Sequence, residues 1–221
     1  LKLPSWISFG KIRGSWSQVG NDLPVFYSRL QDKIVAGGAI QGNDRAPFED
    51  LKPELSSSFE IGTEWRFFNQ RLDFDLTLYK TDTKNQLLTL PSSAGALYKF
   101  YMVNAGKIEN KGIELTIGAT PVMTENFRWK TSINYSLNRN EIKELHPDLN
   151  SFIYGDEGFS MNYAMRLSEG GSFGDIYGWK VDRDDNGKIK LDADGLPLGI
   201  GSGNTEKVGN SNPKYMLGWS N

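Results

Sequence analysis

Apolar and polar residues alternate along the segment 51–88, and this alternation is the strongest pattern in the chain. Before Asn69 and Gln70, one set of alternate positions reads Phe59, Ile61, Thr63, Trp65 and Phe67. After these two residues, the corresponding set reads Leu72, Phe74, Leu76 and Leu78. The positions between them are mostly acidic or polar. A period of two predicts two strands, each with one apolar and one polar face, joined by a turn of about two residues.

The same period predicts four further strands. We expect them at residues 6–19, 112–120 and 127–138, and from residue 214 onward. The strand at 127–138 alternates most strictly, whereas Ile7 and Phe9 break the pattern of the first strand and leave its orientation open. Strands of about 9 to 12 residues have the length of a tilted bilayer crossing.

The connections between these strands are of two kinds. Short turns are expected at 69–70 and at about 124–126, whereas long connections are expected at about 20–56, 83–111 and 139–213. Soluble domains rarely hold such long loops between short hairpins. Outer-membrane barrels combine tight periplasmic turns with long extracellular loops and place aromatic residues at the membrane interfaces. Aromatic residues cluster beside both expected turns: Trp65, Phe67, Phe68, Phe74, Phe127 and Trp129.

These patterns predict an all-β fold, namely a segment of an antiparallel transmembrane β-barrel with long extracellular loops. The smallest such barrel needs about eight strands, so about six strands supply only part of a wall. The chain begins without Met and stops within an expected strand. We therefore expect 1–221 to be a partial barrel domain, an internal piece of a longer protein, with no complete independent domain.

Each face of the predicted wall has an expected role. The apolar side chains should contact outer-membrane lipid; they are Phe59, Ile61, Trp65, Phe67, Leu72, Phe74, Leu76, Leu78, Ile133, Tyr135 and Leu137. The polar side chains should line an aqueous lumen or contact a plug; they are Glu60, Glu64, Arg66, Asp73, Asp75, Glu114, Arg128, Lys130 and Asn134. Both signs of charge are present, so we expect cross-strand ion pairs rather than an ion filter of one sign.

Composition narrows the function classes. The net charge is −2, so the composition gives no sign of the basic surface that nucleic-acid binding requires. The sequence contains no run of about 18 apolar residues, so it predicts no transmembrane helix. A mean hydropathy of −0.48 is compatible with a barrel, because alternation and polar loops dilute the apolar signal. Cysteine is absent, and no nucleophile, base and orienting acid can be assembled, so we expect no enzyme activity.

Four stretches resemble the SusC/RagA family of TonB-dependent outer-membrane transporters. They read KIRGSWSQVGND (11–22), LKPELSSSFEIGTEWRFFNQRLDFDLTLYKTDTKNQLL (51–88), NAGKIENKGIEL (104–115) and VGNSNPKYMLGWSN (208–221). They occur in the family's order and together span nearly the whole chain. The second and third stretches are the most specific to the family.

The resemblance implies a plugged barrel of about 22 strands in the bacterial outer membrane, to which this chain supplies late strands. It implies import of oligosaccharides or peptides, with a SusD-like surface lipoprotein as partner and energy supplied through TonB. In the family, the plug and the TonB box lie toward the N-terminus. We expect both to be absent from this chain, so the sequence does not show energy coupling directly.

The connection at 139–213 should select the substrate, because it is rich in Tyr, Trp, Phe, Asn, Asp and Gly. Aromatic rings can stack on sugar rings while amides and carboxylates bind hydroxyl groups. The candidate substrate-binding residues are Tyr154, Tyr163, Tyr177 and Trp179. The alternative is that these aromatic rings pack the loop into an ordered cap.

One loop segment has the opening pattern of a calcium-binding loop. Asp182, Asp184 and Asn186 precede Gly187 at the spacing of such a loop. Ala193 stands where the bidentate Glu belongs, which removes two ligand oxygens. We therefore expect a turn rich in Asp, Asn and Gly, and no metal or other cofactor.

A soluble all-β carbohydrate-binding module is the alternative function. Such a module would bury the apolar strand faces against a second sheet. Alternation alone fits both models, but three long connections beside two tight turns favour the barrel. A passive porin-like barrel is a third possibility, and it would lack a plug.

Overall fold

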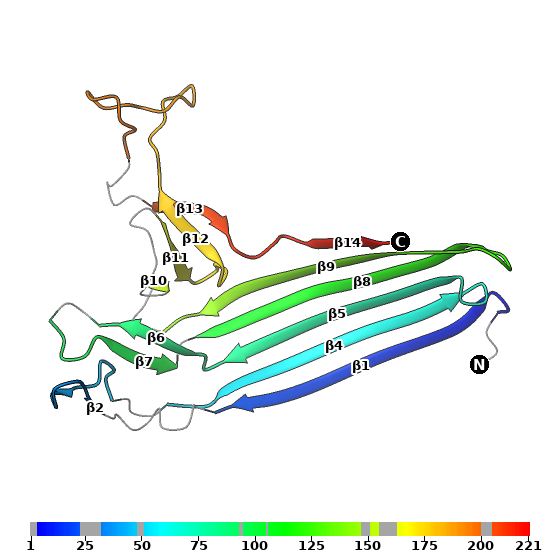
Figure 1. Ribbon diagram of the computed structural model, residues 1–221, viewed down its shortest axis with the longest axis horizontal. Helices are drawn as coiled ribbons and strands as arrows, with labels where there is room; N and C mark the ends of the chain where they lie inside the picture. The colour runs from blue at the N-terminus through cyan, green and yellow to red at the C-terminus, as the bar shows by residue number, and fades with distance from the viewer. Residues whose placement is uncertain are drawn as a thin grey trace.

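The computed structural model describes residues 4–22, 32–47, 51–92, 95–104, 106–146, 151–154, 163–199 and 205–221. Its main element is a six-stranded antiparallel sheet in the order β1-β4-β5-β8-β9-β14 (Figure 1). The strands are β1 (Ile7–Asn21), β4 (Glu54–Phe67), β5 (Leu72–Lys84), β8 (Lys107–Met123), β9 (Arg128–Glu144) and β14 (Met216–Ser220). All six predicted strands are confirmed. Among the described residues, no helix is long and apolar enough to cross a membrane.

Several strands are longer than the apolar pattern indicated. The strands β8 and β9 contain 17 residues each, and both continue past their last apolar outward residue toward the long connections. The added residues are mainly charged or amide side chains, such as Glu109 and Asn140. The ladder continues through them because strand pairing satisfies backbone groups whatever the side chain is.

Both tight turns lie at the same end of the sheet (Figure 1). The prediction of a turn of about two residues at 69–70 is wrong, because residues 68–71 separate β4 from β5. Phe68, Asn69 and Gln70 have φ values of 53°, 53° and 65°, and the Arg71 amide donates to the Phe67 carbonyl at 3.0 Å. Three successive left-handed residues without glycine are not foreseeable from turn preferences.

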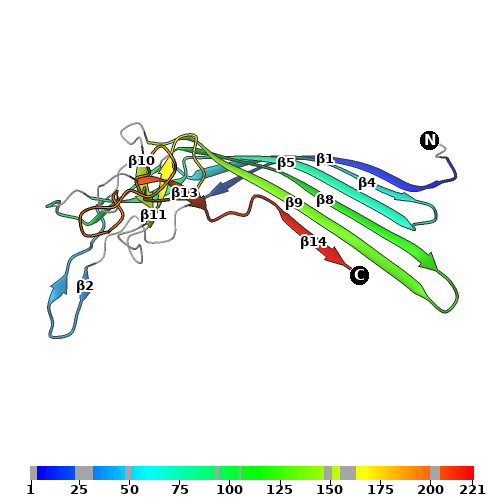
Figure 2. The same cartoon turned by 90° about the horizontal axis from the view of Figure 1, so that it is seen from above.

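The strand register joins the alternating patterns into two continuous faces. One apolar row crosses five strands, and its members are Trp65, Phe74, Ile117, Ile133 and Trp219. This face is uncovered: Phe59 is 54% exposed and Ile133 is 48% exposed. Among the described residues no second sheet packs against it. The strands fan out from one another, as expected for a twisted sheet (Figure 2).

The long connections contain strands of their own at the opposite end of the sheet (Figure 1). The first holds a hairpin of β2 (Lys33–Ile34) and β3 (Ile40–Gln41), and the second a hairpin of β6 (Leu87–Pro91) and β7 (Phe100–Asn104). The third holds a four-stranded sheet, which we call the loop sheet. Its strands are β10 (Ser151–Tyr154), β11 (Tyr163–Ser168), β12 (Asp175–Trp179) and β13 (Thr205–Asn210).

The buried hydrophobic residues of the described chain gather at the loop end. One cluster joins the large sheet to the loop sheet through Ile108, Ile142, Leu145 and Leu167, and another contains Leu88 and Leu90 from β6. Phe173 packs against both clusters. The core therefore fixes the loops to the end of the wall and leaves the apolar face of the wall free.

Candidate transport surface: the polar face and the loop sheet

Arg13 of β1 organises the middle of the polar face. Its guanidinium donates to both carboxylate oxygens of Asp75, at 2.8 and 3.2 Å, and lies 3.7 Å from a carboxylate oxygen of Glu60. Asp75 is two strands away on β5, so Arg13 must cross β4. Gly62 makes the crossing possible, because a Cβ at that position would lie 2.6 Å from Arg13 Nε. The prediction of cross-strand ion pairs is confirmed at this site.

Register alone does not decide which charges pair. Arg66 lies directly opposite Asp73, yet its guanidinium donates to Glu64 of the same strand at 2.9 Å. Sequence reasoning did not include Arg13 among the lumen residues, because the irregular start of β1 left its orientation open. The structure places that irregularity between Ile7 and Phe9. The alternation of Lys11, Arg13 and Ser15 with apolar or small residues is the signal from which the polar side could have been identified.

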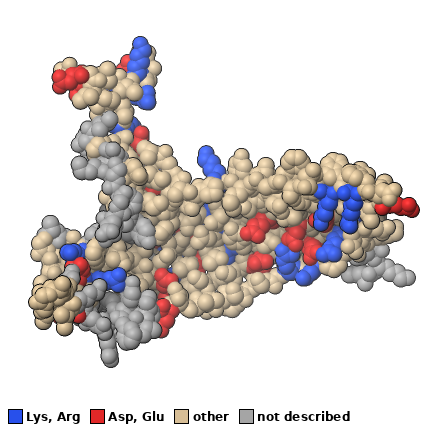
Figure 3. All heavy atoms as spheres, viewed as in Figure 1, with Lys and Arg blue, Asp and Glu red and all other residues tan. Residues whose placement is uncertain are grey.

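A hollow on the polar face lies beside the tight turns and carries both signs of charge. Acidic and basic side chains gather over this half of the large sheet (Figure 3). The charged residues that line the hollow are Glu64, Arg66, Arg71, Asp73, Asp75, Arg128 and Lys130. Six of these had been assigned to the lumen from sequence. A mixed surface of this kind can hold water and an oligomer with polar groups, and it does not favour ions of one sign.

The loop sheet is attached to the wall through β9. The Ile142 amide donates to the Gly171 carbonyl at 2.8 Å, and the Gly170 amide donates to the Ile142 carbonyl at 2.8 Å. Asn140 extends the attachment, since its side-chain oxygen accepts the Phe173 amide at 2.7 Å. The side chains of Asn140 and Ile142 lie on the polar side of β9, where Ile142 belongs to the same buried cluster as Leu167 of the loop sheet. The loop sheet is therefore anchored toward the lumen side of the wall.

A buried carboxylate holds the loop sheet together. Asp175 is 1% exposed and lies 2.6 Å from Lys207 Nζ. It also accepts hydrogen bonds from the Ser172 amide at 3.0 Å and from the Asn210 side chain at 2.6 Å. Burial alone would raise the pKa of Asp175, but these three partners favour the anion and bring the pKa below its ordinary value.

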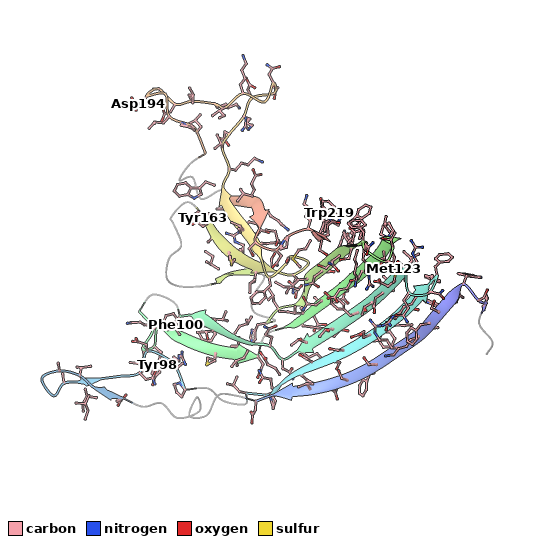
Figure 4. All side chains as sticks on the ribbon, turned by 45° about the vertical axis from the view of Figure 1, so that its right-hand side comes forward. Tyr98, Phe100, Met123, Tyr163, Asp194 and Trp219 are labelled. Atoms are coloured by element: carbon pink, nitrogen blue, oxygen red, sulfur yellow. The ribbon has the colours of Figure 1, made fainter. Side chains whose placement is uncertain are left out.

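The predicted substrate-binding residues do not form one platform. Tyr177 and Trp179 share one face of β12, and the Arg166 guanidinium lies 4.9 Å from the centre of the Tyr177 ring. Tyr163 of β11 pairs with Gly178 and therefore lies on the other face, where it is 52% exposed (Figure 4). Tyr154 ends β10, but its side chain lies outside the described part of the structure.

A second hollow lies beside the loop end of β9, where the sequence predicted no site. The strand β14 pairs with β9 only from Ser132 to Ser136. From Leu137 toward the loop end, this edge of β9 therefore has no neighbouring strand among the described residues. Side chains that line the hollow include Tyr79, Glu114, Asn138, Lys207 and Asn212. They come from distant segments, and only the three-dimensional arrangement brings them together.

The residues of the calcium-like motif form a projecting arm at 180–199 (Figures 1 and 4). The Asp184 carboxylate accepts the Asn186 and Lys188 amides, both at 2.9 Å. Asp192 forms the same kind of turn farther along. The expected turn is therefore present. Within the described residues, no group of three or more His, Cys, Asp or Glu side chains is placed to hold a metal ion.

One uncovered apolar face, one charged face, tight turns at one end and structured loops at the other define a wall segment of an outer-membrane β-barrel. A family model described as TonB dependent receptor-like, beta-barrel, matches residues 2–212. The chain belongs to this family of TonB-dependent receptors, and the relatives described next make it SusC/RagA-like.

Known relatives support the same assignment. The chain is 25% identical over its full length to TonB-dependent receptor P3 of Formosa agariphila, of which it covers 25%. It is 32% identical over 50% of its length to the TonB-dependent receptor SusC of Bacteroides thetaiotaomicron, of which it covers 11%. A structure of the RagAB peptide transporter matches 98% of this chain with a TM-score of 0.75 and 19% identity, which shows a shared fold.

The chain thus spans about a quarter of the length of receptor P3 and of the matched RagAB chain, each covered to 25%. The family confirms the predicted fold class and the location in the bacterial outer membrane. TonB-dependent receptors are transporters and not enzymes.

Proposed function

We propose that this chain supplies wall, lumen surface and part of the extracellular mouth of an active importer of oligosaccharides or peptides. A SusD-like surface lipoprotein is its partner, and TonB supplies the energy. The observation that carries the proposal is the packing of the loop sheet against the polar side of β9, where the Ile142 and Leu167 side chains share a buried cluster. This attachment holds the aromatic side chains of the loop sheet near the mouth of the lumen.

The chemistry of the half-buried Tyr177 and Trp179 fits an oligomer with polar groups and flat surfaces. Tyr177 and Trp179 offer ring faces for sugar rings or for apolar peptide side chains. The Arg166 guanidinium lies over the Tyr177 ring, and its N–H groups can donate hydrogen bonds to hydroxyl or carboxylate oxygens of a substrate. The resemblance to SusC and to the RagAB peptide transporter supports this substrate class.

The projecting arm supports the proposal of a protein partner. Four aliphatic side chains on it are exposed by 40 to 61%: Ile189, Leu191, Leu196 and Leu198. The arm extends away from the large sheet (Figure 1). Apolar side chains gathered on an extended segment are typical of a protein-binding surface. We assign the arm to contact with the surface lipoprotein.

Substrate binding tests the proposal in the full-length protein. Tyr177→Ala combined with Trp179→Ala should weaken binding by about 5-fold or more, because each ring contact contributes about 0.5 to 1.5 kcal/mol. Isothermal titration with panels of neutral oligosaccharides and of short peptides measures the effect and identifies the substrate class.

Tyr163→Ala is the matched control, since Tyr163 lies on the other face of the same sheet. We expect this variant to bind like the wild type. Unchanged affinity in the double variant, or an equal loss in the Tyr163 variant, would contradict the assignment of the Tyr177 face. Binding of neither panel would contradict the proposed substrate class.

A further inference from the structure

A row of three cationic side chains crosses the outward face of the wall directly above the apolar residues. Lys80 of β5 pairs in register with Lys111 of β8, and Lys111 pairs with Arg139 of β9. Each lies two residues from an apolar residue of the same face; these residues are Leu78, Ile113 and Leu137. The row, which we call the cation row, therefore lies on the lipid side of the wall and not in the lumen.

The position of the cation row corresponds to the edge of the hydrocarbon region. On β5 the apolar positions begin at Leu72, so Lys80 lies about 27 Å farther along the strand. At a strand tilt of about 40°, this is about 20 Å along the bilayer normal, close to the height of about 25 Å for the apolar band of such barrels. In the same row, Phe59 pairs with Lys80, and Trp16 pairs with Phe59. Aromatic residues are typical of this depth.

A row of three carboxylates lies one step farther from the membrane. Its members, Asp82, Glu109 and Glu141, are also paired in register. Glu109 is 7% exposed, and its carboxylate lies 2.7 Å from Lys80 Nζ and 3.0 Å from Lys111 Nζ. Hydrogen bonds from these two lysines lower the pKa of Glu109 to about 2, so its carboxylate stays ionised.

The carboxylates balance the cation row from one side only. Lys143 also approaches Glu109, at 3.6 Å, and Glu141, at 2.7 Å, so these acids are shared among several lysines. Arg139 makes no ion pair with any residue in the described part of the chain. Like charges that lie directly opposite in a sheet repel each other. On the membrane side of the row, the next residues of the same face are Leu78, Ile113 and Leu137, which carry no countercharge.

We propose that Lys80, Lys111 and Arg139 bind the phosphate of a phosphorylated lipid in the outer leaflet. Its acyl chains would then lie on the apolar rows below. The planar guanidinium of Arg139 suits bidentate contact with a phosphate, and the two lysines add point charges. Basic clusters at the edge of a membrane bind phosphate-bearing headgroups in this way. Because Lys80, Lys111 and Arg139 are neighbours in register on three strands, all three could bind the same headgroup.

Lipid binding to the full-length protein, delipidated in detergent, tests this site. The probes are diphosphoryl lipid A, the same lipid without phosphates, and inorganic phosphate. We expect the wild type to prefer the phosphorylated lipid. Arg139→Gln combined with Lys111→Gln should weaken its binding by about tenfold or more, whereas the dephosphorylated lipid should bind both proteins equally weakly. Native mass spectrometry counts the bound lipid.

Two controls separate charge, position and folding. Arg128→Gln combined with Lys130→Gln removes the same charge from the polar face and should leave lipid binding unchanged. Lys111→Arg keeps the charge in the row and should keep the binding. Equal binding of the dephosphorylated lipid, unchanged affinity in the Arg139 and Lys111 double variant, or inorganic phosphate binding as tightly as the lipid would each overturn the proposal. Transport assays do not enter this test, so its failure would leave the proposed import function standing.

Discussion

An arginine at Leu115 should destabilise the protein more than arginine at any of its neighbours along β8. The outward positions of β8 read Ala119, Ile117, Leu115, Ile113 and Lys111, so Leu115 is the central one. It lies about 14 Å along the strand from each end of this series, or about 10 Å along the bilayer normal at a tilt of about 40°. A guanidinium at the midplane of a lipid-facing strand costs about 2 to 4 kcal/mol.

Two neighbouring substitutions calibrate this cost. Ala119→Arg places the same charge at the edge of the apolar band, where the cost falls to about 0 to 1 kcal/mol. Thr116→Arg places it on the polar face, at the depth of Leu115. Its main cost is loss of the 3.0 Å hydrogen bond from Thr116 to Asn134, which contributes about 1 kcal/mol.

Urea unfolding of the full-length protein in phospholipid vesicles measures the three free energies. We expect the largest loss for Leu115→Arg, and smaller losses for Ala119→Arg and Thr116→Arg. Equal losses for Leu115→Arg and Thr116→Arg would refute the assignment of the two faces. A loss for Ala119→Arg as large as that for Leu115→Arg would refute the assigned depth.

Three further outcomes follow from individual contacts. Gly62→Leu should displace Arg13 from its carboxylate partners and lower the free energy of unfolding in urea by about 1 to 3 kcal/mol; an unchanged value would contradict the crossing. The pKa of Asp175 lies below its ordinary value of 3.8, so its contribution to loop stability is present above that pH and is lost as the pH falls below it. Protease cleavage of the loop should therefore increase below about pH 4 in the wild type, whereas Asp175→Asn should be cleaved readily at every pH. Calcium should leave the melting temperature unchanged in the wild type and in Asp184→Ala, and a rise in the wild type alone would contradict the turn interpretation.

The wall was predictable from sequence because its pattern is local. Each strand shows its two faces through a period of two, and a shift of one residue would exchange them. Ile133 and Asn134 could therefore be assigned to opposite faces before their neighbours were known. The tight turn at 124–126 was equally local, since the Phe127 amide donates to the Thr124 hydroxyl oxygen at 3.0 Å and closes the turn.

Contacts between distant segments were not predictable. The bridge from Arg13 to Asp75 depends on a missing Cβ at Gly62, on a strand between the two partners. The separation of Tyr163 from Tyr177 depends on the register of β11 with β12. Neither relation leaves a signal in the order of residues along the chain.

The cation row was overlooked for a different reason. The apolar pattern ends near residue 112, so it predicts a strand that begins there and leaves Lys111 in a loop. The ladder in fact continues to Lys107. The strand pairing beyond the apolar band was needed to show that these charged residues lie side by side on the outward face.

The opposite environments of the two faces can be tested directly with spin labels on β9. The chain contains no cysteine, so single cysteines can be introduced into it at Ile133, Asn134, Tyr135 and Ser136. In lipid nanodiscs, we expect labels at 133 and 135 to collide with oxygen dissolved in the lipid, and labels at 134 and 136 to collide with a water-soluble nickel complex. Equal access of the nickel complex to all four positions would contradict a wall with one side in lipid and one side in water.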